Sequence, residues 1–128
     1  MSKTNSIKQF FHTKLTEQVN QVYYGNATDN AVLPYAVFKI RTSTIDFPTH
    51  YGNVEVNFFA SEHDSTDIDT TIDNVESSLD MENFITKNIN LFVYTGTRSN
   101  IENRTKGLMQ IRLTFDINYI YYGGELNG

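Results

Sequence analysis

Two stretches of this chain place apolar residues at the spacing of a helix. In residues 6–22, and again in residues 64–79, an apolar side chain recurs every three or four positions, so each set falls on one helical stripe. Ser6 followed by Gln9 forms a possible capping box at the start of the first stretch. We therefore predict two amphipathic helices. Their stripes consist of Ile7, Phe11, Leu15, Val19 and Val22, flanked by Phe10, and of Ile68, Ile72, Val75 and Leu79.

Four other stretches alternate between apolar and polar positions, as half-buried strands do. They begin at Pro34, Asn53, Ile89 and Met109. The last stretch continues to Tyr121 and, at about 3.3 Å per residue, would extend about 45 Å. Because most strands reach only about 17–20 Å, we expect part of it to bend or to pair outside the domain core.

These elements predict a single α+β domain over residues 1–128. We expect a mainly antiparallel four-stranded sheet with two helices packed on one face, in the order α-β-β-α-β-β. The polar end of the chain, residues 123–128, is expected to be a mobile tail.

Two polar connections are longer than tight turns, at residues 42–52 and 96–107. Loops of this length often carry function, so we take them as candidate contact surfaces, with plain surface connection as an equally open alternative. The first connection could also form an extended hairpin arm. It would expose the apolar side chains of Ile45 and Phe47, which favours contact. The candidate contact residues in the two connections are Ile45, Phe47, His50, Tyr51, Arg98, Arg104 and Lys106.

The end of the last predicted strand carries aromatic and apolar residues on both faces. Tyr119, Tyr121 and Tyr122 flank Ile120 there. Apolar residues on both sides of a strand indicate burial against something other than its own sheet, either a neighbouring subunit or a covering loop of the same chain. The three tyrosines are therefore candidate interface residues, and both alternatives stay open.

Composition narrows the function classes. A chain of 128 residues that is 39% hydrophobic can bury one core. Its net charge of −5 gives no general attraction for nucleic acid. It has no cysteine, so it cannot use disulfides or a thiolate zinc site, and an intracellular origin fits best. No apolar run approaches the ~20 residues that cross a bilayer, and we expect neither a signal peptide nor a membrane partner.

The densest group of reactive side chains is the acidic run at residues 64–78. Read as a calcium loop that starts at Asp67, this run puts Ile72 where the turn needs glycine and Ser78 where a bidentate glutamate is needed. A solvated helix face explains the run better, with Asp67 and Asp69 near the positive end of the helix dipole. We therefore predict no metal site and no cofactor.

The remaining candidates for catalysis are three isolated histidines, His12, His50 and His63. None belongs to a helical metal-binding pattern, and no nucleophile elbow or phosphate loop occurs in the chain. We predict no enzymatic activity and no catalytic residue. A small enzyme or ligand-binding domain, in which His50, His63 and carboxylates meet only in the fold, remains an alternative.

The arrangement of these segments resembles the tail terminator proteins of long-tailed phages, also called tail completion or tail-to-head joining proteins. The resemblance covers about residues 6–122 and consists of packing patterns, not of reactive residues. The segments that carry it are "IKQFFHTKLTEQVNQVYYG", "LPYAVFKI", "GNVEVNFFAS" leading into "DSTDIDTTIDNVESSLD", and "GLMQIRLTFDINYIYY".

The resemblance implies a structural protein that forms a hexameric ring. Such a ring caps the tail tube and joins it to the head connector, so the expected partners are further copies, the tail-tube protein and the head-connector protein, with DNA passing through without specific binding. The protein would be assembled in the host cytoplasm and reside in the virion. Asp67, Asp69 and Asp73 could line the channel, because a negative lumen repels DNA. Another neck or tail ring component, a head-closure or tail-tube protein, is the alternative.

Overall fold

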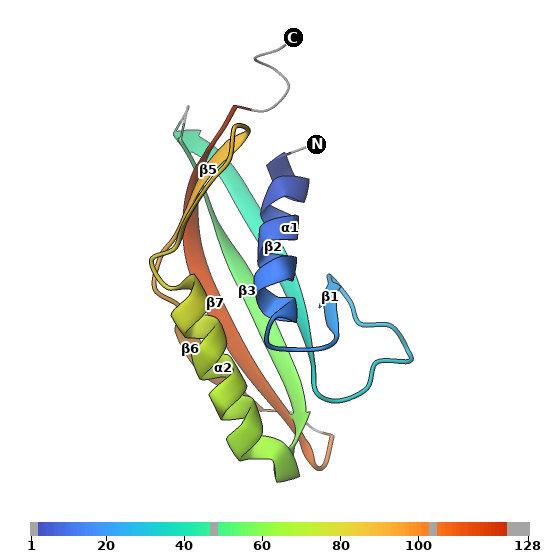
Figure 1. Ribbon diagram of the computed structural model, residues 1–128. Coiled ribbons are helices and arrows are strands. Elements are labelled where there is room, and N and C mark those ends of the chain that lie inside the picture. The colour runs from blue at the N-terminus through green and yellow to red at the C-terminus, as the bar shows by residue number, and fades with distance from the viewer. Residues whose placement is uncertain (1–2, 47–48, 103–104, 123–128) are drawn as a thin grey trace.

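The computed structural model describes residues 3–46, 49–102 and 105–122, without the side chains of residues 3–4 and 43–46 (Figure 1). These residues form an α+β fold, as predicted, with two α-helices and one seven-stranded sheet. The predicted mobile tail, residues 123–128, lies outside the described residues. In chain order the elements are α1 (Lys3–Thr16), β1 (Val22–Tyr24), β2 (Tyr35–Asp46), β3 (Thr49–Ser61), a 3-10 turn η1 (Glu62–Asp64), α2 (Ser65–Leu79), β4 (Asn83–Ile85), β5 (Ile89–Val93), β6 (Thr97–Ile101) and β7 (Leu108–Tyr121).

The long strand β7 is the centre of the sheet. The strand order is β1-β2-β3-β7-β5-β4, and β6 also pairs with β7. On one side β7 pairs with β3 from His50↔Tyr119 to Ser61↔Leu108, and on the other side it pairs with β5 and then β6. Of the two expectations for this strand, that part of it bends or that part of it pairs outside the domain core, the second was therefore wrong. Two short strands placed end to end satisfy its second edge within the same chain.

The sheet contains three strands that the four-strand prediction lacked, β1, β4 and β6. It is mainly antiparallel, as predicted, and β1 makes it mixed. β1 and β4 have three residues each, too few to show a period in the sequence. β6 reads Thr-Arg-Ser-Asn-Ile and is mostly exposed, so it shows no apolar alternation. β1 runs parallel to β2, from Val22↔Ala36 to Tyr24↔Phe38, and the other pairings of the described strands are antiparallel.

The first helix is shorter than predicted at one end and longer at the other. It ends at Thr16, whose hydroxyl donates to the carbonyl oxygens of His12 and Thr13 in the last turn. Val22 belongs instead to β1, because the run Val-Tyr-Tyr is β-branched and aromatic and pairs with the edge of β2. The helix begins at Lys3, so Ser6 lies inside it and the predicted capping box is wrong.

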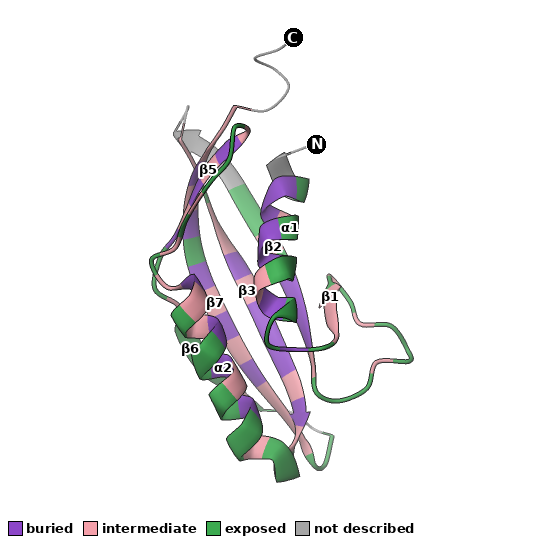
Figure 2. Cartoon of the chain, in the orientation of Figure 1, coloured by how far each residue is buried: buried purple, intermediate pink, exposed green. Residues whose placement is uncertain are grey.

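Both helices pack on the same face of the sheet and enclose the core (Figures 1 and 2). The stripe predicted for the second helix is confirmed, since Ile68, Ile72, Val75 and Leu79 are all buried in α2. Alternate residues of the strands point to this face and join the same core. These residues include Ala36, Phe38, Val54, Val56, Phe58, Leu113 and Phe115.

The opposite face of the sheet, which we call the open face, consists of the intervening residues of β2, β3 and β7. Here Tyr35 stacks on Phe59 with ring centroids 4.9 Å apart. The centre is polar: Asn57, only 8% exposed, accepts from Gln110 Nε2 and Arg112 Nε at 3.1 Å each and donates to Glu55 Oε2 at 3.1 Å. The open face is thus ordered by ring contacts and hydrogen bonds instead of by a covering layer.

Candidate functional site

Most of the first predicted contact loop is strand: residues 42–46 and 49–52 belong to β2 and β3. β2 and β3 pair antiparallel up to Asp46↔Thr49, which corresponds to the extended hairpin arm, the alternative left open. Gly52 permits the close approach of the two strands, because a Cβ there would lie 2.2 Å from the Arg41 carbonyl oxygen. Phe47 and the side chain of Ile45 lie outside what the structure describes.

His50 and Tyr119 meet at the far end of this hairpin. Their rings are stacked with centroids 5.2 Å apart, and Tyr119 is 1% exposed, so this tyrosine is buried within its own chain. Burial raises the pKa of the Tyr119 hydroxyl, and the nearby Thr42 hydroxyl opposes the rise without reaching good hydrogen-bond geometry. Tyr51 points to the open face and is 42% exposed.

The other two candidate tyrosines lie where β7 ends. Tyr121 is half-buried and packs against the core. Tyr122 is also half-buried, and its backbone N–H donates to the Asn88 carbonyl oxygen at 2.7 Å. The chain itself therefore covers part of this aromatic run, which corresponds to the second of the two alternatives. Whether a neighbouring subunit also contacts these residues stays a prediction.

The second predicted contact loop, residues 96–107, contains strand β6, and Arg98 of this strand is engaged within the chain. Arg98 binds Asp73 Oδ1 at 2.6 Å and binds Glu76 Oε1 through both Nε, at 2.9 Å, and Nη2. Partial burial lowers the pKa of Arg98, but the hydrogen bonds and charges of the two carboxylates outweigh it and raise the pKa. Arg98 thus fastens the edge strand to α2. Lys106 is exposed in the turn before β7, and Arg104 lies outside the described residues.

Most acids of the run 64–78 are exposed on η1 and α2, and Glu76 is half-buried. Asp67 and Asp69 are exposed, while Asp73 shares Arg98 with Glu76. Among the described residues no group of three or more His, Cys, Asp or Glu side chains could hold a metal ion. His12 and His63 are exposed on α1 and η1, respectively. Within the described part of the chain, neither helix is long and apolar enough to cross a bilayer.

An apolar groove between α1 and the β4–β5 pair was not anticipated from the sequence. α2 covers the opposite end of the sheet, so the strip beside α1 over β4 and β5 has no helix above it (Figure 1). The groove has a volume of about 490 Å³, and its apolar lining comes from Phe10, Phe84 and Ile89. The rings of Phe10 and Phe84 lie 4.5 Å apart, and Lys14 and Lys87 also line the groove. Phe84 gave no signal because β4 is too short to show a period.

A projecting loop, residues 25–34, is the second unanticipated feature. It connects β1 to β2, and because these two strands are parallel the chain must return along their whole length before β2 begins. Figure 1 shows this connection extending away from the body of the molecule. Val32 is 62% and Leu33 39% exposed near its end. The sequence shows the loop as a polar break but gives no sign that it projects.

Comparisons with known proteins identify the fold. No protein-family model matches the chain, and no curated protein matches it. Among solved structures, a protein that carries no functional description superposes with a TM-score of 0.71 at 14% identity, over 95% of this chain and 99% of that one. A chain from the virion of a native gene transfer agent particle superposes with a TM-score of 0.60 at 8% identity, over 86% of this chain and 91% of that one.

Both superpositions extend over most of each chain, so the likeness concerns the whole arrangement of helices and sheet and not one motif. At these identities it establishes the fold alone. The fold does not by itself assign a function.

Proposed function

We propose that this chain is a structural protein of a phage-type virion. The observation that carries the proposal is that a chain of the gene transfer agent virion has the same fold over 86% of this chain. A virion subunit acts through surfaces that bind other subunits, and this chain offers an apolar groove with charged residues in its lining and a projecting loop with exposed Val32 and Leu33. On this proposal the protein resides in the virion and has no enzymatic role.

Within the virion we infer the role of tail terminator, a ring that ends the tail tube and joins it to the head connector. The segments that resemble this family correspond to α1, β2, β3 with α2, and β7, which are the main elements of the observed fold. The ring would be hexameric, with the tail-tube and head-connector proteins on its two sides and DNA passing through it.

The acids of α2 are candidates for the channel lining. Asp67 and Asp69 are exposed, and neither has an ion pair among the described residues. In a ring, a negative lumen would keep the DNA backbone from adhering. Substitution of both residues by lysine should leave the ring intact and reduce DNA delivery. If particles carrying both substitutions deliver DNA at the normal rate, the acids do not line the channel.

The role is tested by deleting the gene from the phage or prophage that encodes it and measuring tails by electron microscopy. A missing terminator should leave tube growth without a stop, so tails would vary in length and remain separate from filled heads. A plasmid copy of the wild-type chain should restore joined particles of uniform tail length.

Other outcomes identify the alternative roles. Normal detached tails with heads that lose DNA indicate a head-closure protein, and complete absence of tubes indicates a tail-tube protein. Unchanged particles that lack this protein would overturn the virion proposal and return attention to a small enzyme or ligand-binding domain.

A further inference from the structure

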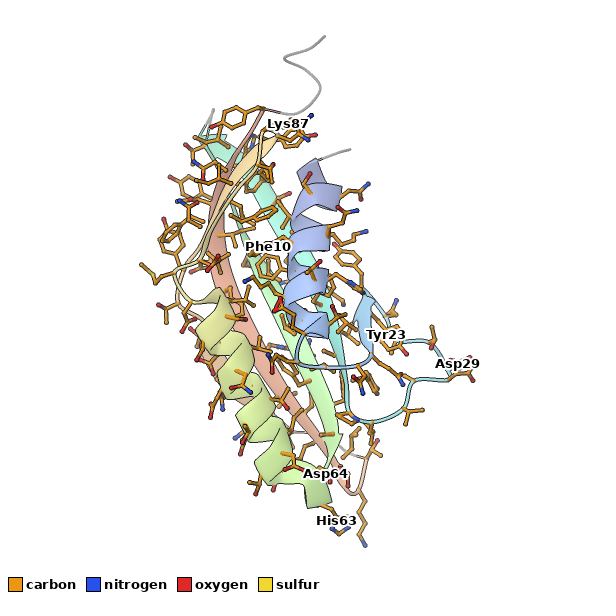
Figure 3. All side chains as sticks on the ribbon, in the orientation of Figure 1. Phe10, Tyr23, Asp29, His63, Asp64 and Lys87 are labelled. Atoms are coloured by element: carbon orange, nitrogen blue, oxygen red, sulfur yellow. The ribbon has the colours of Figure 1, made fainter. Side chains whose placement is uncertain are left out.

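The groove and the projecting loop lie at opposite edges of the sheet. The loop leaves β1, which is the first strand in the sheet order, and the groove lies beside β4, which is the last. Figure 3 shows Asp29 at the outer tip of the loop, and Phe10 and Lys87 in the upper part of the molecule beside α1. Two different surfaces at opposite edges are what a head-to-tail contact between identical copies requires.

The loop is held in a defined position at its base. Gln21 Oε1 accepts from the Tyr23 hydroxyl at 2.7 Å and from the backbone N–H of Val32 at 3.1 Å. The Ala31 N–H also donates to the Thr28 carbonyl oxygen at 3.1 Å. These bonds fix the backbone next to the two exposed apolar side chains, so less conformational freedom would be lost when the loop binds a partner.

The groove and the loop are complementary in polarity. Val32 and Leu33 are apolar and exposed, and the floor of the groove consists of the rings of Phe10 and Phe84 with Ile89. Isolated exposed apolar residues are ordinary, but these two are adjacent at the inner end of the loop, and the groove offers an apolar floor to such a pair.

The groove and the loop are also complementary in charge. Asp29 is the one charged residue in positions 25–34 of the sequence. The groove is lined by two lysines, Lys14 and Lys87, and by one glutamate, Glu82. The Lys14 ammonium lies 5.9 Å from the centre of the Phe10 ring, so a positive charge stands directly over the apolar floor. An occupant with apolar side chains and one carboxylate fits this arrangement.

We propose that the 25–34 loop of one copy docks in the α1–β4 groove of the next copy. The inference rests on the proposed ring and names the contact that builds it. The contact is heterologous, so each copy donates a loop at one edge and receives one at the other, and the repeat closes into a ring when the rotation between copies divides a full turn.

The absence of cysteine from the sequence makes the contact directly testable by crosslinking. Full-length chains carrying Val32→Cys and Thr13→Cys place one thiol on the loop and one in the groove, where exposed Thr13 contributes to the lining. A short bis-maleimide should join neighbouring copies into a ladder that ends at the closed ring. The control pair is Val32→Cys with Ser77→Cys, which puts the second thiol on the exposed side of α2.

The expected rate of crosslinking is about tenfold higher for the loop–groove pair than for the control pair, because docking raises the effective concentration of the two thiols. A mixture of chains with Val32→Cys alone and chains with Thr13→Cys alone should stop at the crosslinked dimer. Equal rates for the two pairs, or self-crosslinking of Val32→Cys alone, would overturn the proposal, the second because it indicates a symmetric loop-to-loop contact.

A charge exchange tests the same contact through Asp29 and Lys87, with Val32 and Thr13 left in place. With a thiol pair at Leu33 and Gln9, Asp29→Lys and Lys87→Glu should each slow crosslinking about two- to fivefold, the size of one exposed ion pair, and the double variant should recover most of the loss. Circular dichroism confirms that the variants fold. Independent losses without recovery would show that the two charges do not meet.

The outcomes separate this inference from the proposed function. If the protein is found at the neck of particles and the loop–groove pair reacts no faster than its control, the virion role stands and the contact is wrong. If the ladder forms and the protein is absent from particles, the contact stands and the virion role is wrong.

Discussion

The two faces of the sheet are built from alternate residues of the same strands and yet depend on different interactions. On the helix-covered face Phe58 is 1% exposed and belongs to the apolar core. Its neighbour Phe59 lies on the open face, half-buried, and stacks on Tyr35. One face is stabilised by removal of apolar area from water, and the other by paired rings and a hydrogen-bond network around Asn57. The same strand can therefore stabilise the core with one face and present an accessible surface with the other.

The largest expected difference in the free energy of unfolding is between variants of these two adjacent phenylalanines. Phe58→Ala should lower the free energy of unfolding by about 3–5 kcal/mol, because it leaves a cavity in the core. Phe59→Ala removes one exposed-side ring pair and should cost about 1 kcal/mol. Urea unfolding followed by circular dichroism measures both. Equal losses would mean that the open face is as tightly packed as the core.

Asn57, at the centre of the open face, should contribute less to the free energy of unfolding than the ring of Phe58. Asn57→Ala removes an acceptor shared by Gln110 and Arg112, and these side chains can turn to water, so we expect a loss of about 1 kcal/mol in urea unfolding. Asn57→Asp is the matched variant, since it keeps the acceptor and loses the donor to Glu55. A loss above that of Phe58→Ala would place the main support of the sheet on its open face.

The ion pairs between β6 and α2 should contribute still less to the free energy of unfolding, and their contribution should depend on salt. Arg98→Ala breaks the contacts with Asp73 and Glu76 at a partly exposed site, for an expected cost of about 0.2–1 kcal/mol that shrinks at high ionic strength. Arg98→Lys keeps the charge and loses the two-pronged geometry. A cost that persists in molar salt would mean that packing of the Arg98 side chain, and not its charge, holds the edge strand.

The smallest change in the free energy of unfolding at neutral pH is expected when the buried hydroxyl of Tyr119 is removed. Because burial raises the folded-state pKa of Tyr119 above the ordinary value of about 10, its contribution to stability is complete below pH ~10 and is lost as the pH rises through the folded-state pKa. Tyr119→Phe should change neutral-pH stability by less than about 1 kcal/mol and should reduce the loss of stability in alkali. Identical alkaline profiles for the two chains would show that this hydroxyl ionises as freely in the folded protein as in the unfolded one.

The sequence predicted the elements in which buried residues recur regularly over many positions. It missed the elements without such a repeat. The stripe of α2 and the alternation of β5 and β7 identify buried residues directly, because burial imposes a period on them. β1 and β4 have too few residues to show a period, and β6 is mostly exposed and polar. Val22 continued the helical stripe by coincidence while pairing with β2. The sheet order could not be read either, since it depends on which edges meet in space.

The candidate contact residues were predicted less well for a related reason. Long polar connections were taken as loops, yet residues 42–46 and 49–52 continue β2 and β3, and residues 97–101 form β6. Backbone pairing tolerates polar side chains at an edge, so polarity alone does not distinguish a loop from an edge strand. The groove was invisible because its floor joins Phe10 of α1 to Phe84 of β4, and no local pattern reports a contact between distant segments.

The central position of β7 has a consequence for the synthesis of the protein. β3, β5 and β6 all precede β7 in the chain, and each pairs with it along one edge. While the ribosome is still adding the residues before Leu108, the β2–β3 hairpin has an unoccupied edge and the β4–β5 pair has nothing to join. Cooperative folding therefore waits until the strand that enters the middle of the sheet has emerged, and during that interval the exposed edges of newly made chains are open to pairing with other chains.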